Sequence, residues 1–137
     1  TMGVGLGQAI AAAVVHPGKK IINVQGDSAF GFGGMEIETA CRYRLPITTI
    51  IINNNGIGGG PGEEMPPDKI PVSAYTPNAR YEKLADVFGG KGYFVTEASQ
   101  LEPTLKEALA HDMPTIVNIM IDPRANRKQQ QFAWLTR

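Results

Sequence analysis

Apolar and polar positions divide the chain into segments that predict helices and strands in alternation. Residues 2–15 carry apolar side chains at helical spacing, and residues 35–43 and 81–88 show the same period. A further helix is expected after Ser99, because Ser99 and Glu102 match a capping box. Short apolar runs rich in β-branched residues predict strands at 21–24, 47–52, 93–95 and 115–121.

This alternation predicts the α/β class of fold. Strands separated by helices form βαβ units, so we expect a parallel sheet flanked by helices on both faces. Residues 21–24 are almost continuously apolar, which indicates a strand covered on both faces. In such folds the functional site lies at the carboxyl ends of the strands. We therefore expect the polar residues that follow strands 21–24 and 47–52 to lie close together.

We expect residues 1–122 to form one domain and residues 123–137 to form a polar, basic C-terminal tail. The chain opens with Thr-Met-Gly-Val-Gly, which resembles the middle of a motif rather than a natural start. We therefore interpret the 137 residues as a fragment of a longer polypeptide.

Residues 56–78 are rich in Gly and Pro, which predicts a long mobile loop over the strand ends. Tyr75, Arg80 and Tyr81 lie at or just after the end of this loop. They are candidates for contact with a substrate, and a surface role is the alternative for each of them.

Charge and composition argue against several classes of partner. The 13 basic residues balance the 13 acidic ones, so bulk charge does not favour binding to nucleic acid or to a membrane surface. No apolar run is long enough to span a bilayer. The single cysteine, Cys41, excludes an internal disulfide framework and offers no metal-site spacing. We expect neither a nucleic-acid nor a membrane partner, and any phosphate group must be held by a local site.

Two polar clusters carry the candidate chemistry. Asp27 follows Gly26 at the end of one predicted strand and precedes a glycine-rich turn into a helix, whereas three asparagines follow the next strand. The carboxylate offers a ligand for a hard cation, beside helix N–H groups that favour anions. A magnesium-bound diphosphate is the simplest ligand that satisfies both groups.

Other phosphate-binding motifs fit the sequence poorly. The stretch 26–34 lacks the lysine of a P-loop, and Gly3, Gly5 and Gly7 do not match the dinucleotide spacing. The remaining alternative is an ordinary strand-to-helix turn in which Asp27 caps the helix. A turn alone explains three consecutive asparagines poorly, because their amides need partners and disfavour the strand that they follow.

The motif Gly26-Asp27-Ser28, followed later in the chain by Asn53-Asn54, resembles the signature of thiamin-diphosphate enzymes in the domain that binds the cofactor's diphosphate. The resemblance implies the thiamin-diphosphate-binding fold. It also implies that Asp27, the Asn54 side chain and the Gly56 carbonyl oxygen bind Mg²⁺. The full set of cofactor-binding residues that it implies is Met2, Gly26, Asp27, Ser28, Ala29, Asn54, Gly56 and Ile57.

The resemblance also assigns roles within this set. Ser28 and Ala29, where the helix begins, would donate hydrogen bonds to the diphosphate. Met2 matches the residue that holds the cofactor in its bent, reactive shape, although a plain core methionine is the alternative interpretation.

Within this family the chain is similar to the 2-hydroxyacyl-CoA lyases and to their relatives, the oxalyl-CoA decarboxylases. The similarity rests on the stretches 26–36, 41–43, 88–93 and 127–137, the last of which favours the lyases. The implied reaction cleaves a 2-hydroxyacyl-CoA to an aldehyde and formyl-CoA, as in fatty acid α-oxidation. The alternatives are an oxalyl-CoA decarboxylase or a non-catalytic module of the same fold. Gly58 departs from the family, which usually has Tyr at this position, and this leaves the acyl-chain preference open.

The resemblance further implies partners that lie outside this chain. The glutamate that activates the cofactor is expected in a separate pyrimidine-binding domain, contributed by another subunit of a homo-oligomer, with an acyl-CoA as substrate. Glu36 and Glu38 are poor substitutes, because both lie within the predicted helix 35–43. The isolated chain is therefore expected to be inactive. Relatives are often peroxisomal, but Thr136-Arg137 is not a peroxisomal address, so we expect a peroxisomal or a cytoplasmic protein.

Overall fold

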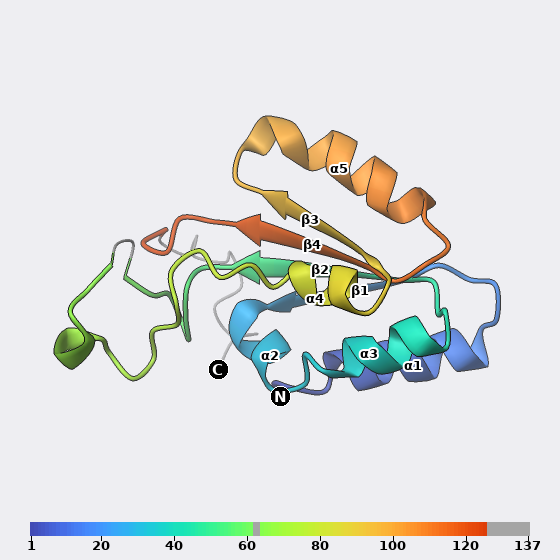
Figure 1. The fold of residues 1–137 in the computed structure, drawn as a ribbon, viewed down its shortest axis with the longest axis horizontal. Coiled ribbons are helices and arrows are strands. Elements are labelled where there is room, and N and C mark those ends of the chain that lie inside the picture. Colours follow the sequence, from blue (N-terminus) through green and yellow to red (C-terminus); the bar gives the residue numbers. More distant parts are fainter. Residues whose placement is uncertain (62–63, 126–137) are drawn as a thin grey trace, which may run out of the picture.

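The computed structural model describes residues 1–61 and 64–125, which form a four-stranded sheet between two layers of helices (Figure 1). All paired strands are parallel, in the order β1-β2-β4-β3. The strands are β1 (Ile21–Gly26), β2 (Ile47–Asn53), β3 (Lys91–Val95) and β4 (Thr115–Met120). The helices are α1 (Gly5–Val15), α2 (Asp27–Gly31), α3 (Glu36–Arg42), α4 (Lys83–Val87) and α5 (Ala98–Ala110), and η1 (Pro67–Lys69) is a short 3-10 helix. The predicted α/β fold class is confirmed, and none of the helices in the described ranges is long and apolar enough to cross a membrane.

Two hydrophobic clusters hold the helices on the sheet. The larger cluster joins α1, α2, α3 and α4 to one face, where Ile37, Ile51 and Ile116 are fully buried. The smaller cluster lies under α5 on the other face and contains Val117. Burying one such aliphatic side chain contributes about 1.5–3 kcal/mol. The β-branched runs of β2 and β4 therefore supply the core, because these two strands lie in the middle of the sheet.

The strand β1 is covered on only one face within the described residues. Helix α5 packs on β3 and β4 rather than on β1 (Figure 1). Ile22 and Val24 consequently remain 54% and 61% exposed. The prediction that helices cover both faces of 21–24 is wrong for this part of the chain, because β1 lies at the edge of the described sheet. A cavity of about 500 Å³ is lined by residues of β1 and α1.

The first helix is shorter than its apolar pattern predicts. It begins at Gly5 rather than at Met2, because Gly3 adopts a left-handed φ of 85° that α-helical geometry does not allow. Val14, which the pattern places on the apolar face, is 66% exposed, and Ala9 is buried in the core instead. Met2 therefore precedes the helix and does not belong to it.

A different residue pair caps α5 from the one predicted. Glu97 is the N-cap residue and forms a capping box with Gln100, whose side-chain oxygen accepts the Glu97 N–H at 3.1 Å. Ser99 lies inside the helix, and Glu102 forms an ion pair with Lys106 at 2.7 Å. The cap is set earlier because Glu97 already has the extended backbone that a cap requires, with φ at −123°.

We expect Gly7→Ala to stabilise the protein. Gly7 is an exposed residue of α1, and a Cβ atom built on it would meet no atom within 4 Å. Alanine at a helical position is more favourable than glycine by about 0.5–1 kcal/mol. Thermal unfolding should show a higher melting temperature for this variant. The control is Gly5→Ala in the same helix, which should give no such gain because its Cβ would lie 2.8 Å from Gln25 Oε1; equal melting temperatures for the two variants would contradict the prediction.

Backbone hydrogen bonds close the loop predicted at 56–78. Gly56 forms an antiparallel bridge with Ala74, and the Ile57 N–H donates to the Ser73 carbonyl oxygen at 2.8 Å. The loop therefore leaves the sheet and returns through a narrow neck, visible as the long green excursion beyond β2 in Figure 1. The mobility of this loop stays a prediction, and so does the boundary between the domain and the tail at residues 122 and 123. Residues 126–137 of the predicted tail lie outside the described ranges.

Candidate metal and diphosphate site

Asp27 lies at the carboxyl end of β1 and faces the residues that follow β2. The parallel pairing of the two strands places Gly26 beside Ile52, so the segments after both strands meet at one edge of the sheet. Asp27 Oδ1 accepts the Ser28 N–H at 2.8 Å, and Oδ2 accepts the Gly56 N–H at 2.9 Å. The two polar clusters of the sequence are therefore joined through one carboxylate, and the N-cap residue of α2 is Gly26 rather than Asp27.

The Asp27 carboxylate is almost completely buried, with 1% of its surface exposed. Burial raises the pKa of Asp27 above its ordinary value, and the hydrogen bonds from Ser28 and Gly56 reduce that shift. A bound cation would favour the ionised carboxylate. Burial, and then the negative charge of Asp27, also raise the pKa of Tyr81 to about 12, so the neighbouring phenol is neutral at physiological pH.

Asn54 adds a third polar group beside Asp27. One polar atom of its amide lies 3.2 Å from Asp27 Oδ1 and 2.7 Å from the Gly56 carbonyl oxygen, and the other lies 3.2 Å from the Gly59 nitrogen. If the NH₂ group takes the first position, it donates to both of these oxygen atoms. If the amide oxygen takes it, three oxygen atoms converge and need a cation between them. In the hydrogen-bonded arrangement the amide oxygen accepts the Gly59 N–H, whereas the cation-binding one turns the NH₂ group towards that N–H and leaves two donors opposed.

The donor set at this point consists of one carboxylate, one amide and one backbone carbonyl. Within residues 1–61 and 64–125, no three His, Cys, Asp or Glu side chains gather into a possible metal site. The candidate site is therefore an all-oxygen set built from mixed groups, which suits a hard cation such as Mg²⁺. The residues present fit the ion that the sequence resemblance implies.

The asparagines on either side of Asn54 hold its backbone. Asn53 Oδ1 accepts the Asn55 N–H at 3.1 Å, and Asn55 adopts a left-handed φ of 63°, which asparagine tolerates better than most residues. Asn55 Oδ1 in turn accepts the Asn78 N–H at 2.9 Å. The sequence assigned a role only to Asn54, because the partners of its neighbours lie far along the chain.

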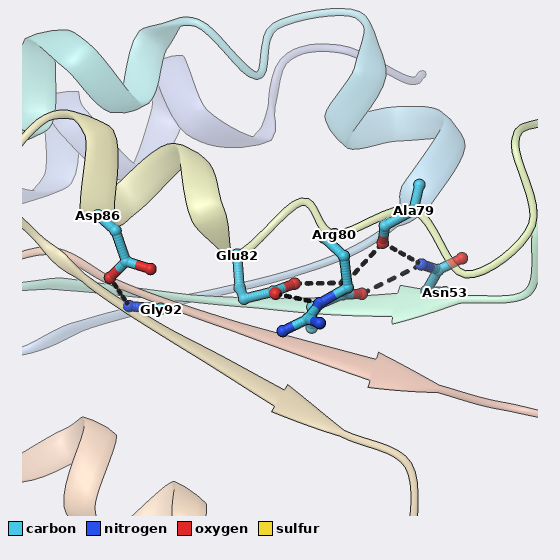
Figure 2. A network of polar contacts seen from close by, with 7 residues as sticks. Asn53, Ala79, Arg80, Glu82, Asp86 and Gly92 are labelled. Atoms are coloured by element: carbon cyan, nitrogen blue, oxygen red, sulfur yellow. Dashed lines mark hydrogen bonds and ion pairs between the residues drawn. The ribbon is translucent and has the colours of Figure 1, made fainter.

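Asn53 belongs to a buried polar network that the sequence did not indicate (Figure 2). Its Nδ2 donates to Asn118 Oδ1 at 3.2 Å and to the Ala79 carbonyl oxygen at 3.3 Å. Asn118 Nδ2 donates to Glu82 Oε2 at 2.9 Å, and Arg80 Nε donates to Glu82 Oε1 at 2.5 Å. Arg80, a predicted candidate for substrate contact, is thus ion-paired with Glu82.

The remaining predicted cofactor residues occupy different surroundings. The Ser28 N–H is engaged by Asp27, and Ala29 lines the cavity beside β1. Met2 and Ile57 are 49% and 47% exposed. The structure therefore brings together Gly26, Asp27, Ser28, Asn54 and Gly56, and it leaves Met2 and Ile57 half exposed beyond α1 and β2.

A cavity of about 580 Å³ lies between α2 and the returning end of the loop. Tyr75 and Tyr81 line it together with Phe32 and Ala79. A smaller cavity of about 380 Å³ under the loop shares Tyr75 with the first one. The two tyrosines thus line a space large enough for a ligand, next to the residue that carries the buried carboxylate.

The fold and the site define a class of protein: a parallel α/β domain with a candidate cation site at the carboxyl ends of neighbouring strands. The family model described as "Thiamine pyrophosphate enzyme, C-terminal TPP binding domain" matches residues 1–119, and the chain belongs to this family. The cofactor of the family is thiamin diphosphate, which these enzymes bind together with Mg²⁺.

Individual relatives agree with the family match. The chain is 51% identical to 2-hydroxyacyl-CoA lyase 1 of Homo sapiens over its whole length, and 46% identical over 90% of its length to oxalyl-CoA decarboxylase of Escherichia coli (strain K12). It spans 26% and 22% of those proteins, respectively. Among solved structures, a thiamine diphosphate-dependent 4-hydroxybenzoylformate decarboxylase of Rhodococcus jostii RHA1 superposes with a TM-score of 0.70 at 26% identity, covering 88% of this chain and 23% of that one.

Proposed function

We propose that this chain is the diphosphate-binding domain of a thiamin-diphosphate-dependent carbon–carbon lyase, which cleaves a 2-hydroxyacyl-CoA to an aldehyde and formyl-CoA. The observation that carries the proposal is the convergence of the Asp27 carboxylate, the Gly56 carbonyl oxygen and one polar atom of the Asn54 amide. Identity of 51% to a 2-hydroxyacyl-CoA lyase supports the reaction, although the chain spans only 26% of that relative.

In this proposal, Asp27, Asn54 and the Gly56 carbonyl hold Mg²⁺, and the ion anchors the diphosphate. Ala29 offers its N–H to a diphosphate oxygen; we assign the hydroxyl of Ser28 to the same role, because its N–H donates to Asp27 Oδ1 at 2.8 Å, whereas the hydroxyl contact with the same atom is long, at 3.4 Å. The bound cofactor supplies the carbanion chemistry. The chain itself contributes binding and orientation.

Other residues complete the cofactor site in the same proposal. Gly26 allows the strand to end directly at the carboxylate. Met2 and Ile57, half exposed here, would contact the cofactor between this domain and the next.

The activating glutamate is proposed to come from a pyrimidine-binding domain of another subunit in a homo-oligomer. Glu36 and Glu38 on α3 do not replace it, since Glu36 is exposed and Glu38 forms an ion pair with Arg42 at 3.0 Å. The chain alone is therefore expected to show no turnover. We keep the peroxisome and the cytoplasm as the two candidate compartments of the enzyme.

Product identification tests the proposed reaction. The full-length protein is supplied with thiamin diphosphate and Mg²⁺ and given a 2-hydroxyacyl-CoA or oxalyl-CoA separately, and the products are analysed by mass spectrometry. Both reactions release formyl-CoA, so the second product decides between them. A chain-shortened aldehyde is the expected result, and reactions without the cofactor are the control.

Two other outcomes would favour the alternatives. Carbon dioxide from oxalyl-CoA alone would establish a decarboxylase, which the 46% identity to oxalyl-CoA decarboxylase favours as the second candidate. No product from either substrate, with the cofactor bound, would favour a non-catalytic module. Gly58 supports that last candidate, because its left-handed φ of 76° disfavours the Tyr that the family usually has there.

A further inference from the structure

A continuous set of buried polar side chains connects the proposed metal ligands to the protein surface. We call residues 53–56 the metal loop. Asn53 and Asn118 are fully buried, and Glu82 is 2% exposed. The set ends at Arg80, whose side chain is 47% exposed and lies over the Phe94 ring, with its guanidinium carbon 4.1 Å from the ring centroid. Figure 2 shows Glu82 and Arg80 on one side of the Ala79 carbonyl and Asn53 on the other.

From the metal loop to Glu82, each group in this set donates a hydrogen bond to the next one. An ionised carboxylate only accepts hydrogen bonds, so Glu82 requires Asn118 to turn its NH₂ group towards it. Asn118 then presents its oxygen to Asn53, which donates through Nδ2. As a result, Asn53 has its own oxygen free to accept the Asn55 N–H. The Ala79 carbonyl oxygen, which accepts from Nδ2 of Asn118 at 2.9 Å and of Asn53 at 3.3 Å, favours the same orientations, so Glu82 and this carbonyl fix the two amides together.

The last bond of the set lies inside the metal loop. Asn55 stands between Asn54 and Gly56, and its left-handed φ of 63° turns the chain so that both neighbours reach Asp27. A left-handed backbone costs about 1–2 kcal/mol per residue, and the hydrogen bond from the Asn55 N–H to Asn53 helps to offset this cost.

We propose that Glu82 is a positioning residue: its carboxylate sets the orientation of the Asn118 and Asn53 amides and thereby holds the turn that presents Asn54 and Gly56 to the cation. This inference rests on the proposed function, because it needs Mg²⁺ at the metal loop. The inference also assigns Asn53 and Asn118 a role in holding the metal loop, which the sequence motif does not assign.

A purely structural role explains Glu82 less well. Burying an ionised carboxylate is costly even when it is paired, and well-packed apolar residues often stabilise a protein as much or more. The ion pair with Arg80 has one partner that is half exposed, which weakens its contribution. Two groups in the network only accept hydrogen bonds: the Ala79 carbonyl oxygen, which takes Asn118 Nδ2 at 2.9 Å and Asn53 Nδ2 at 3.3 Å, and the Glu82 carboxylate, which is the only side chain of the two.

Glu82→Gln tests this direction with little change in volume. The glutamine amide has an oxygen that accepts hydrogen bonds and an NH₂ group that donates them. The Arg80 N–H donates to the oxygen, as it does to Glu82 Oε1 in the parent protein. The NH₂ group of the glutamine then faces the NH₂ group of Asn118, which can accept from it only by reversing and losing its bond to the Ala79 carbonyl oxygen, and Asn53 must then reverse at the same cost. The NH₂ group of Asn53 would then oppose the Asn55 N–H, donor against donor. We expect the affinity for the metal to fall about 10- to 100-fold, as it does when residues that support metal ligands are removed elsewhere.

Binding of Mn²⁺ to the full-length protein with thiamin diphosphate, followed by electron paramagnetic resonance, measures this affinity without catalysis. The matched control is Asp86→Asn. Asp86 lies on α4, accepts the Gly92 N–H at 2.8 Å and is turned away from Asn53 (Figure 2). It should keep the parent's affinity for Mn²⁺ even if it melts at a lower temperature. Equal loss of affinity in both variants would overturn the inference.

A double variant, Glu82→Gln with Asn118→Asp, moves the carboxylate, which only accepts hydrogen bonds, from position 82 to position 118. The new carboxylate at position 118 can accept from the new amide at position 82 and from Asn53 Nδ2, so Asn53 regains its native orientation, whereas the Ala79 carbonyl oxygen loses the Asn118 donor and keeps that of Asn53. We expect Mn²⁺ affinity to return to within about threefold of the parent, a difference of about 0.7 kcal/mol.

Two results would overturn the inference: an unchanged affinity in Glu82→Gln, or a double variant as weak as the single one. A parent protein that binds no Mn²⁺ in the presence of thiamin diphosphate would overturn the proposed function as well. The parent measurement therefore separates failure of the inference from failure of the function on which it rests.

Discussion

Asp27→Ala is expected to abolish Mg²⁺-dependent binding of thiamin diphosphate by the full-length protein. Asp27 is the only charged group among the three proposed ligands, and its carboxylate is 1% exposed. Groups that merely support a ligand change metal affinity by 10–100-fold, so loss of the charged ligand should exceed about 100-fold. Isothermal titration of the cofactor with and without Mg²⁺ measures this loss.

The substitution also removes an acceptor from two backbone donors, the N–H groups of Ser28 and Gly56. Each unsatisfied donor costs about 1–3 kcal/mol, so titrations must be made well below the melting temperature of the variant. Asp27→Asn keeps the size of the side chain and should also lose binding, because it lacks the charge. Glu36→Ala removes an exposed carboxylate from α3 and should bind as the parent does. Tight binding by both Asp27 variants would favour the non-catalytic alternative.

Gly56→Ala is expected to weaken both the metal site and the fold. A Cβ atom on Gly56 would lie 2.5 Å from the Ser73 carbonyl oxygen and 3.2 Å from the Ala74 Cα, and both are backbone atoms of the loop neck. The neck must therefore open, and the Gly56 carbonyl must leave the position it shares with Asn54. Strain of about 1–3 kcal/mol adds to the loss of neck hydrogen bonds worth about 0.5–1.5 kcal/mol each.

Gly58→Ala is the matched control for this prediction. Gly58 also has a left-handed φ, 76°, but a Cβ atom there would meet nothing within 4 Å. We expect this control to lose only about 1–2 kcal/mol through backbone strain and to keep its affinity for Mg²⁺. Chemical unfolding and the same titration compare the two variants. A Gly56→Ala protein that matches Gly58→Ala in both measurements would show that the neck does not support the site.

Local pattern predicted most of the fold because the strands of a parallel sheet are strongly apolar. The run at 47–52 became β2 almost unchanged, since β2 is buried between two neighbours. The same reasoning failed for 21–24, where the pattern indicated coverage on both faces but Ile22 stays exposed. Which strand lies at an edge depends on the order of the strands, and a short apolar run does not contain that order.

The site could be predicted only as far as its ligands are local in sequence. Asp27 and Asn54 were found because each follows a strand, and parallel strands end at the same edge. The sequence did not predict the hydrogen-bond network of Asn53. Its members Asn118 and Glu82 lie far along the chain, on β4 and at the start of α4. Nothing near Asn53 in the sequence points to either residue.

The sequence by itself determined the α/β class, the sites of the strands and the residues that meet at the candidate cation site. Hydrophobic period and strand-end chemistry are local properties, so they can be read without knowing the fold. The tertiary structure alone decided the edge position of β1, the closed neck at Gly56 and the direction of the amide network that begins at Glu82. Each of these depends on contacts between distant segments, which form only when the sheet order and the loop path are fixed.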